Sequence, residues 1–209
     1  MKNIIYEKGK IILFEGYDGA GKTTLISLFK RHLSSKGLSS LVIDNTGNRV
    51  TANIDFAIRD GVLEIAPATE ILLRLARECE RIKTLKTEIT KYNYIILDRG
   101  IVSLISWIHY YNLPYEKYKL HIEEIIEEMS PCYLVDCYLN YDESWNRVLS
   151  RGNLSKKESR GKEINNRAFT VQREIFSHFN WPEITKYEIN TKGSREDCLQ
   201  ELLACLSLK

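Results

Sequence analysis

Several features that define whole classes of proteins are missing from this sequence. No apolar run approaches 18 residues, which argues against a membrane span, and residues 1–10 have no apolar signal-peptide core. No internal repeat or low-complexity stretch is visible. The net charge is only +2, which argues against bulk binding of nucleic acid. We therefore expect a cytoplasmic protein without a membrane or nucleic-acid partner.

Cysteine is sparse, and its spacing is not that of metal-binding motifs. We expect reduced thiols in the core rather than a disulfide framework at Cys79, Cys132, Cys137, Cys198 and Cys205. Of the 209 residues, 44% are hydrophobic and 28% are charged, as in ordinary globular proteins. A chain of this length can bury one sizeable core, so we predict a single domain over residues 1–209.

Short apolar runs alternate with segments of helical periodicity along the chain. We predict strands at 11–15, 40–43, 94–98, 133–139 and 186–190. Helices are expected between them, with Asp142 and Ser194 as the N-caps of two. Strands that alternate with helices form a parallel sheet covered on both faces, with ligands at the carboxyl ends of the strands. The prediction is an α/β fold with five parallel strands.

The strongest motif is Gly-Tyr-Asp-Gly-Ala-Gly-Lys-Thr-Thr at residues 16–24, which matches the phosphate-binding pattern G-x-x-x-x-G-K-[ST]. An apolar strand precedes it and a helix follows, a context that a chance glycine-rich turn would lack. The glycines let several backbone N–H groups point at one anion. Lys22 is predicted to reach the terminal phosphates of ATP, and the Thr23 hydroxyl to ligate Mg²⁺. The predicted nucleotide-binding residues are Gly16, Asp18, Gly19, Ala20, Gly21, Lys22, Thr23 and Thr24.

A second motif, Asp98-Arg99, follows the strand at 94–98. A carboxylate at a strand end beside a phosphate loop is suited to hold Mg²⁺, so Asp98 is predicted as a metal-site residue. Arg99 is predicted to bind the phosphate of an acceptor bidentately. The alternative is a surface salt bridge at the strand end, which the upstream phosphate loop disfavours.

The segment at about 151–163 is polar, basic and punctuated by glycine. It is either a solvated surface connection or a lid that brings cations over the ATP phosphates, and its spacing does not decide between them. As a lid it would supply Arg151 to catalysis, together with Lys156, Lys157 and Arg160.

With these motifs the chain resembles the thymidylate kinase family. The resemblance rests on Phe14 through Thr24, on Thr69 through Leu73, on Leu97-Asp98-Arg99 with Ser103, and on Pro131 through Gly152, and it covers nearly the whole chain. It implies a doubly wound, P-loop nucleoside-monophosphate kinase-like sheet with a lid loop, and ATP and Mg²⁺ as cofactors. It also implies that Asp18 contacts the sugar hydroxyl of the acceptor.

The predicted acceptor site departs from the family pattern. The position of the thymine-stacking Phe is Arg74, and the position of the carbonyl-binding Arg is Glu78, so we expect these two residues to face the acceptor cleft. Gly100 stands after the Asp-Arg pair, where the family has Tyr, His or Phe. Leu104 and Ile108 stand where the family has polar residues that reach the base edge. Arg49 is a candidate for the arginine that holds the acceptor phosphate, although it is out of register.

The predicted activity is transfer of the ATP γ-phosphoryl group to a nucleotide, nucleoside or other small-molecule acceptor other than thymidylate. The catalytic residues would be Lys22, Asp98, Arg99 and Arg151, and the acceptor-binding residues Asp18, Arg49, Arg74, Glu78 and Arg99. Three alternatives remain: a genuine thymidylate kinase, a non-catalytic ATP-binding switch or scaffold, and a nucleic-acid end kinase. A homodimer is compatible with the sequence.

Overall fold

The computed structural model describes residues 9–45, 52–53, 56, 64–155 and 157–208. Its strands are β1 (Lys10–Glu15), β2 (Ser40–Ile43), β3 (Tyr94–Asp98), β4 (Tyr133–Tyr138) and β5 (Thr185–Asn190). Its α-helices are α1 (Lys22–Ser35), α3 (Pro67–Glu88), α4 (Ile101–Tyr110), α5 (Lys119–Met129), α6 (Tyr141–Leu149), α7 (Lys162–His178) and α8 (Arg195–Cys205). Two short 3-10 helices are η1 (Tyr115–Lys117) and η2 (Glu158–Arg160).

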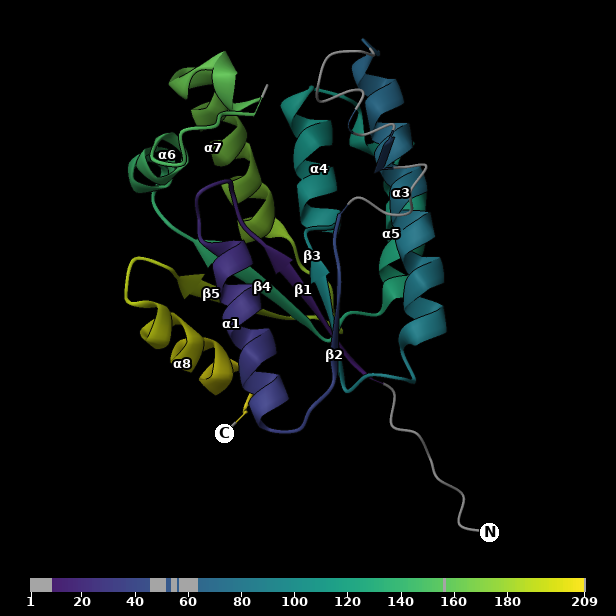
Figure 1. Ribbon diagram of the computed structural model, residues 1–209. Coiled ribbons are helices and arrows are strands. Elements are labelled where there is room, and N and C mark those ends of the chain that lie inside the picture. Colours follow the sequence, from purple (N-terminus) through teal and green to yellow (C-terminus); the bar gives the residue numbers. More distant parts are fainter. Residues whose placement is uncertain (1–8, 46–51, 54–55, 57–63, 156, 209) are drawn as a thin grey trace.

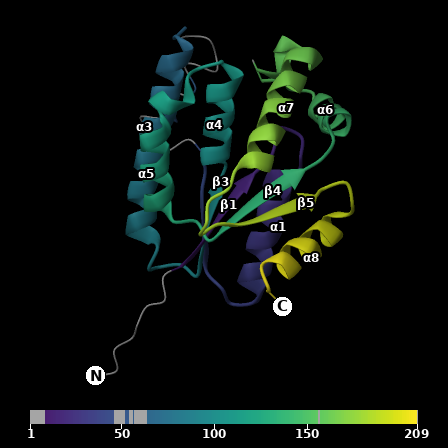
Figure 2. The same ribbon diagram turned by 180° about the vertical axis from the view of Figure 1, so that it is seen from behind.

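The five strands form one parallel sheet in the order β2-β3-β1-β4-β5. Helices α1 and α8 cover one face of the sheet, and α3, α4, α5 and α7 lie on the other side (Figures 1 and 2). The chain therefore winds in both directions from the central strand, which confirms the predicted α/β fold. Each of the five predicted strands is present within one residue of its predicted bounds.

The central strand β1 shows why the sequence pattern worked. Its residues from Ile11 to Phe14 are all buried, because a parallel strand in mid-sheet has helices on both faces. Ile11 and Leu13 pack with the helices α3, α4 and α5, while Ile12 and Phe14 pack with α1 and α8. The alternation of side chains along the strand divides the core into these two clusters.

One of the two predicted helix caps differs from prediction. Helix α6 is capped by Asn140, whose side chain accepts a 2.9 Å hydrogen bond from the Glu143 amide, and Asp142 lies inside the first turn. Ser194 caps α8 as predicted, accepting a 3.1 Å hydrogen bond from the Asp197 amide.

The cysteines are all free thiols, as expected, but they are not all in the core. Cys137 and Cys198 are buried, whereas Cys79 and Cys132 are exposed. Across the described ranges, no helix combines the length and apolarity needed to cross a bilayer.

Candidate active site

The phosphate loop connects β1 to α1, and its shape depends on glycine. Gly16, Gly19 and Gly21 adopt φ values of 144°, 86° and 80°, a region that other residues rarely occupy. A Cβ atom at Gly19 would lie 2.2 Å from the Ser144 carbonyl oxygen, so no side chain fits there. Helix α1 begins at Lys22, directly after this loop. The loop therefore places the unpaired N–H groups of a helix N-terminus where an anion can bind.

Lys22 and Asp98 meet at the carboxyl edge of the sheet, where β1 and β3 run side by side. Lys22 Nζ forms an ion pair with Asp98 Oδ1, and only 7% of Lys22 is exposed. Burial lowers the pKa of Lys22, although the Asp98 carboxylate opposes that effect. Thr23, in the first turn of α1, is exposed. A hydroxyl and a carboxylate are the hard oxygen donors that Mg²⁺ prefers, so Thr23 and Asp98 fit the predicted metal site.

Asp18 lies between two cations. Arg99 forms an ion pair with Asp18 Oδ1, and Lys157 Nζ lies 2.5 Å from Asp18 Oδ2. Burial raises the pKa of the Asp18 carboxyl, but Arg99 and Lys157 outweigh burial and hold it well below its usual range. The structure thus joins three of the predicted residues, from the phosphate loop, the Asp-Arg motif and the segment at 151–163.

Lys157 occupies a position among aromatic rings that the sequence did not indicate. Its Nζ lies 4.2 Å from the ring centroid of Tyr17 and 5.6 Å from that of Trp107. These distances permit cation–π attraction. Arg151, before Lys157 in the sequence, and Arg160, after it, are both exposed. Lys156 and Arg49 lie outside the described residues.

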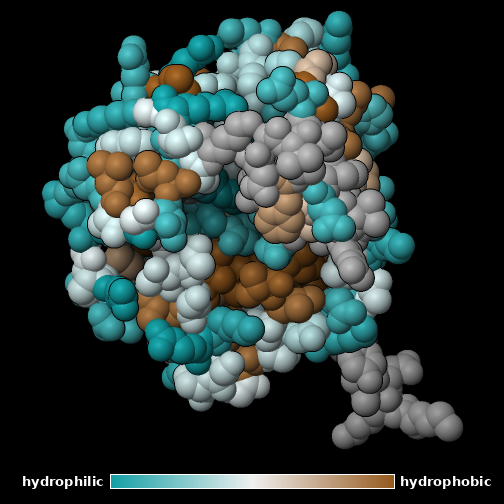
Figure 3. Space-filling model, turned by 45° about the horizontal axis from the view of Figure 1, so that its top comes forward, coloured by the Kyte–Doolittle hydropathy of each residue, from teal (hydrophilic) through white to brown (hydrophobic). Residues whose placement is uncertain are grey.

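A small, partly open pocket lies beside Arg99 and Lys157. Its further lining comes from Tyr17 and from α4 and α7, namely Ser103, Ser106, Trp107, Tyr110, Ala168 and Gln172. Figure 3 looks down on this side of the molecule and shows a recess with hydrophilic residues near the middle of the view. The pocket is thus polar and aromatic, and it adjoins the site where phosphate would bind.

Glu15 binds Ser103, which lines the pocket, and was not predicted as a functional residue. It is completely buried at the end of β1 and accepts hydrogen bonds from the Gly100 amide (2.9 Å), the Ser103 amide (3.1 Å) and the Ser103 hydroxyl (2.5 Å). Burial raises the pKa of Glu15, against the effect of the Ser103 hydrogen bonds and of Arg99. Glu15 therefore fixes the first turn of α4 against β1.

Comparison with known proteins adds to this geometry. The family model described as "Thymidylate kinase" matches residues 14–201. The chain belongs to the thymidylate kinase family. The thymidylate kinase of Brachyspira hyodysenteriae is 27% identical over 94% of this chain and 92% of its own length. That of Caldanaerobacter subterraneus is 35% identical over 46% of this chain, and the match spans only 47% of the relative.

A solved structure confirms the fold of the thymidylate kinase family. Thymidylate kinase from Candida albicans superposes with a TM-score of 0.70 at 17% identity, over 96% of this chain and 92% of that one. The doubly wound, nucleoside-monophosphate kinase-like sheet predicted from the sequence is thus observed.

The expectation that Glu78 faces the acceptor cleft beside Arg74 is wrong. Arg74 binds Glu70, with its Nε at 3.0 Å and its Nη2 at 2.5 Å from Glu70 Oε1, and its guanidinium lies 5.1 Å from the Trp107 ring centroid. Glu78 is only 1% exposed and accepts a 2.7 Å hydrogen bond from Arg81. A reversed charge at position 78 therefore does not face an acceptor, because this carboxylate is already paired inside the protein.

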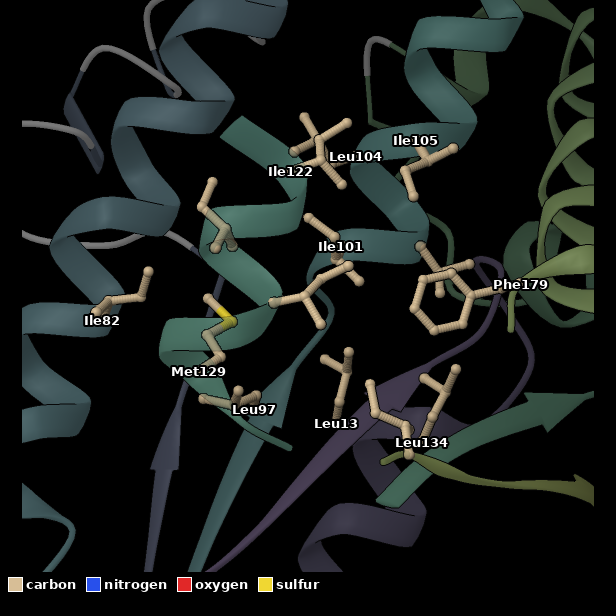
Figure 4. Packing of buried hydrophobic residues seen from close by; sticks show 14 of the residues in the cluster. Leu13, Ile82, Leu97, Ile101, Leu104, Ile105, Ile122, Met129, Leu134 and Phe179 are labelled. Atoms are coloured by element: carbon tan, nitrogen blue, oxygen red, sulfur yellow. The ribbon is translucent and has the colours of Figure 1, made fainter. Parts of the chain in front are cut away.

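Leu104 and Ile108, which occupy the family's polar base-edge positions, do not line the pocket. Both are buried in the core cluster that contains Leu13, and Figure 4 shows Leu104 among those core side chains. The pocket side of α4 is formed by Ser103, Ser106, Trp107 and Tyr110, which recur at intervals of three and four residues. That spacing was the signal that could have found these residues in the sequence.

Asp136, at the end of β4, is a buried carboxyl next to this site. It pairs with Arg173 of α7, whose Nη2 also lies 2.5 Å from Glu188 Oε2. Burial raises the pKa of Asp136 to about 7, because the loss of hydration outweighs the attraction of Arg173. The folded protein therefore keeps a proton on Asp136 at pH values where an exposed aspartate has lost it.

Replacing Asp136 should change how stability depends on pH. The unfolded carboxyl ionises near about pH 4, so the contribution of Asp136 to the free energy of unfolding is full below that pH. It is lost as the pH rises to about 7, the native pKa. Urea denaturation should show a smaller fall in stability from pH 5 to pH 8 in Asp136→Asn than in the parent. Asp142→Asn, at an exposed position in the first turn of α6, is the control; an unchanged slope in Asp136→Asn would refute the assignment.

Proposed function

We propose that this protein is an ATP-dependent phosphotransferase that acts on a small acceptor bound in the pocket beside Arg99. The observation that carries this proposal is the convergence of Lys22, Asp98, Asp18 and Arg99 at one edge of the sheet. The nucleotide side and the acceptor side of a phosphoryl-transfer site are thus adjacent. Membership of the thymidylate kinase family supports the same reading.

The nucleotide would bind at the phosphate loop. The loop amides and Lys22 would hold the β- and γ-phosphates, and Thr23 and Asp98 would hold Mg²⁺. When bound, the ion neutralises charge on the transferred phosphoryl group. In the structure Lys22 pairs with Asp98, which keeps both side chains at the place where the phosphates would arrive.

The acceptor would be oriented by Arg99 and Asp18 for in-line attack on the γ-phosphorus. Phosphoryl transfer needs little covalent chemistry from the protein, so positioning and charge neutralisation supply most of the rate. Lys157 already reaches this site from the segment at 151–163, which supports a lid role for that segment. Arg151 and Arg160 are the further lid cations in this proposal.

The charges and rings of the pocket indicate the kind of acceptor. Arg99 and Lys157 flank a single carboxylate, Asp18, so the cluster carries an excess positive charge that suits an acceptor phosphate. Tyr17 and Trp107 line the pocket and offer aromatic rings for a planar group. A nucleotide carries both groups and is the acceptor class that we propose.

Thymidylate is the acceptor that tests this proposal most sharply. Arg74 stands where the family places its thymine-stacking Phe, so we expect thymidylate to be a poorer substrate than another nucleotide. Family membership favours thymidylate itself and makes a genuine thymidylate kinase the second candidate.

Steady-state kinetics with thymidylate and a panel of other nucleotides should separate these two candidates. We expect a value of kcat/KM for thymidylate well below about 10⁴ M⁻¹s⁻¹, and a higher value for another acceptor. A value for thymidylate at or above that level, as the best of the panel, would establish the second candidate.

A further inference from the structure

Arg81 is a charged residue buried in the middle of α3, with 0% of its side chain exposed. Its Nη1 donates to Glu78 Oε2 at 2.7 Å and to the Arg99 carbonyl oxygen at 2.8 Å. Its Nη2 donates to the Ile43 carbonyl oxygen at 3.1 Å. One guanidinium therefore ties α3 to the carboxyl ends of β3 and β2, at the edge of the sheet that carries the candidate active site.

Burial of a guanidinium is unfavourable unless ion pairs and hydrogen bonds replace its water. Glu78 supplies the counter-charge, and Arg77 Nε lies 3.7 Å from Glu78 Oε1. An apolar side chain of similar size often serves stability as well as a buried ion pair does. Stability alone therefore does not account for a charge at this position. The two backbone carbonyl groups that Arg81 binds indicate which part of the chain it holds in place.

The more informative partner is Arg99, whose backbone has an unusual conformation. Its φ is 60°, in the left-handed region that residues other than glycine seldom adopt. Such a conformation persists when the surrounding structure holds it in place. The Arg99 amide donates to the Phe14 carbonyl oxygen at 2.8 Å, and its carbonyl oxygen accepts from Arg81. The backbone is thus held on both sides of the bend.

This bend sets the direction of the Arg99 side chain. It turns the chain from β3 into α4 and leaves the Arg99 guanidinium paired with Asp18, at the edge of the acceptor pocket. The next residue is packed closely as well, because a Cβ atom at Gly100 would lie 2.9 Å from Leu13 Cδ1. Without Arg81, the Arg99 carbonyl oxygen would lose its partner on the α3 side, and the bend could relax.

We propose that Arg81 is a positioning residue that acts through Arg99. It holds the left-handed bend at Arg99 and thereby aims the Arg99 guanidinium at Asp18 and at the acceptor. Glu78, which the sequence suggested as an acceptor contact, acts one step behind it as the counter-ion of Arg81. This inference rests on the proposed phosphotransferase function, in which Arg99 binds the acceptor.

The kinetic test compares Arg81→Met with Ile82→Ala, which removes a buried core side chain from the next position of α3. Arg81→Met should lower kcat/KM for the acceptor at least tenfold while the KM for ATP stays unchanged. Ile82→Ala should lower the melting temperature but leave kcat/KM per folded molecule within about twofold. Arg81→Lys, which can keep one of the hydrogen bonds, should recover part of the loss and is the second variant if Arg81→Met fails to fold.

A double-mutant cycle shows whether Arg81 acts through Arg99. If it does, Arg81→Met should lower acceptor kcat/KM by less than twofold in an Arg99→Ala background. A full additional tenfold loss in that background would overturn the proposal. So would normal acceptor kinetics in Arg81→Met combined with a lower melting temperature, because that result describes a residue that only stabilises the fold.

Hydrogen exchange gives a readout that does not depend on activity. The amides of Arg99 and Gly100 should exchange at least tenfold faster in Arg81→Met than in Ile82→Ala at matched global stability. Equal exchange in the two variants would overturn the positioning role even if the kinase is active. A parent protein that transfers no phosphoryl group would instead refute the proposed function, with the exchange result still deciding whether Arg81 holds the bend.

Discussion

Replacing Lys22 by alanine is expected to lower turnover by about 10²–10³-fold, the usual loss when one donor to a transition-state oxyanion is removed. The loss should fall on kcat more than on KM, because the charge on the transferred group grows as the reaction proceeds. The fold should remain intact. Burial lowers the pKa of Lys22, so the folded protein stabilises its charged form little except through Asp98. Removing this charge should therefore cost little folding free energy.

The matched control for Lys22 is Lys30→Ala, which removes an exposed lysine from the same helix. It should leave kcat within about twofold of the parent value. Steady-state kinetics and thermal melts on the three proteins check the prediction. Unchanged turnover in Lys22→Ala would refute the phosphotransferase reading, because no other described lysine combines the phosphate loop with a contact to Asp98.

The second large effect is expected for Asp98→Asn. The amide keeps the size of the side chain but loses the negative charge that pairs with Lys22 and would hold Mg²⁺. We expect activity at fixed Mg²⁺ to fall by about 10–100-fold, with a higher Mg²⁺ concentration needed for half-maximal rate. A titration of rate against Mg²⁺ measures both quantities.

Asp197→Asn, an exposed position on α8, serves as the control for Asp98. If Asp98→Asn has a lower melting temperature but normal activity per folded molecule and a normal Mg²⁺ requirement, the Lys22–Asp98 pair is structural. The result would leave the nucleotide site without its metal carboxylate, and another acidic residue would have to be sought.

The placement of the phosphate loop beside Asp98 was predictable because its signals are local. The glycines, Lys22 and Thr23 lie within nine consecutive residues, and a strand before them and a helix after them are visible as apolar patterns. Asp98 was found for a similar reason, since parallel strands end at one edge of the sheet. The local sequence pattern and the α/β fold together were sufficient to predict that Asp98 lies beside the phosphate loop.

The acceptor side was not predictable, because it depends on how helices are rotated against the sheet. An alignment gives a position in α3 or α4 but not the direction of its side chain. Glu78 pairs with Arg81 inside the protein, and Leu104 packs in the core, although the family resemblance implied that both positions contact the acceptor. Their burial follows from tertiary contacts between α3, α4 and the end of β3.

Lys157 shows a similar limit in the segment at 151–163. A run of basic residues does not say which of them will meet a partner elsewhere in the chain. Asp18 lies 139 positions from Lys157 in the sequence, and Tyr17 and Trp107 complete the surroundings of the Lys157 ammonium group. That combination requires the fold, because it draws on three separate elements.

The most direct test of the account follows the labelled γ-phosphoryl group of ATP into a panel of nucleotides and nucleosides. The account predicts an acceptor-dependent labelled product that forms in equal amount with ADP, requires Mg²⁺, and disappears in Lys22→Ala. It would be contradicted if ATP binds but no acceptor becomes labelled, or if ADP forms at the same rate without any acceptor.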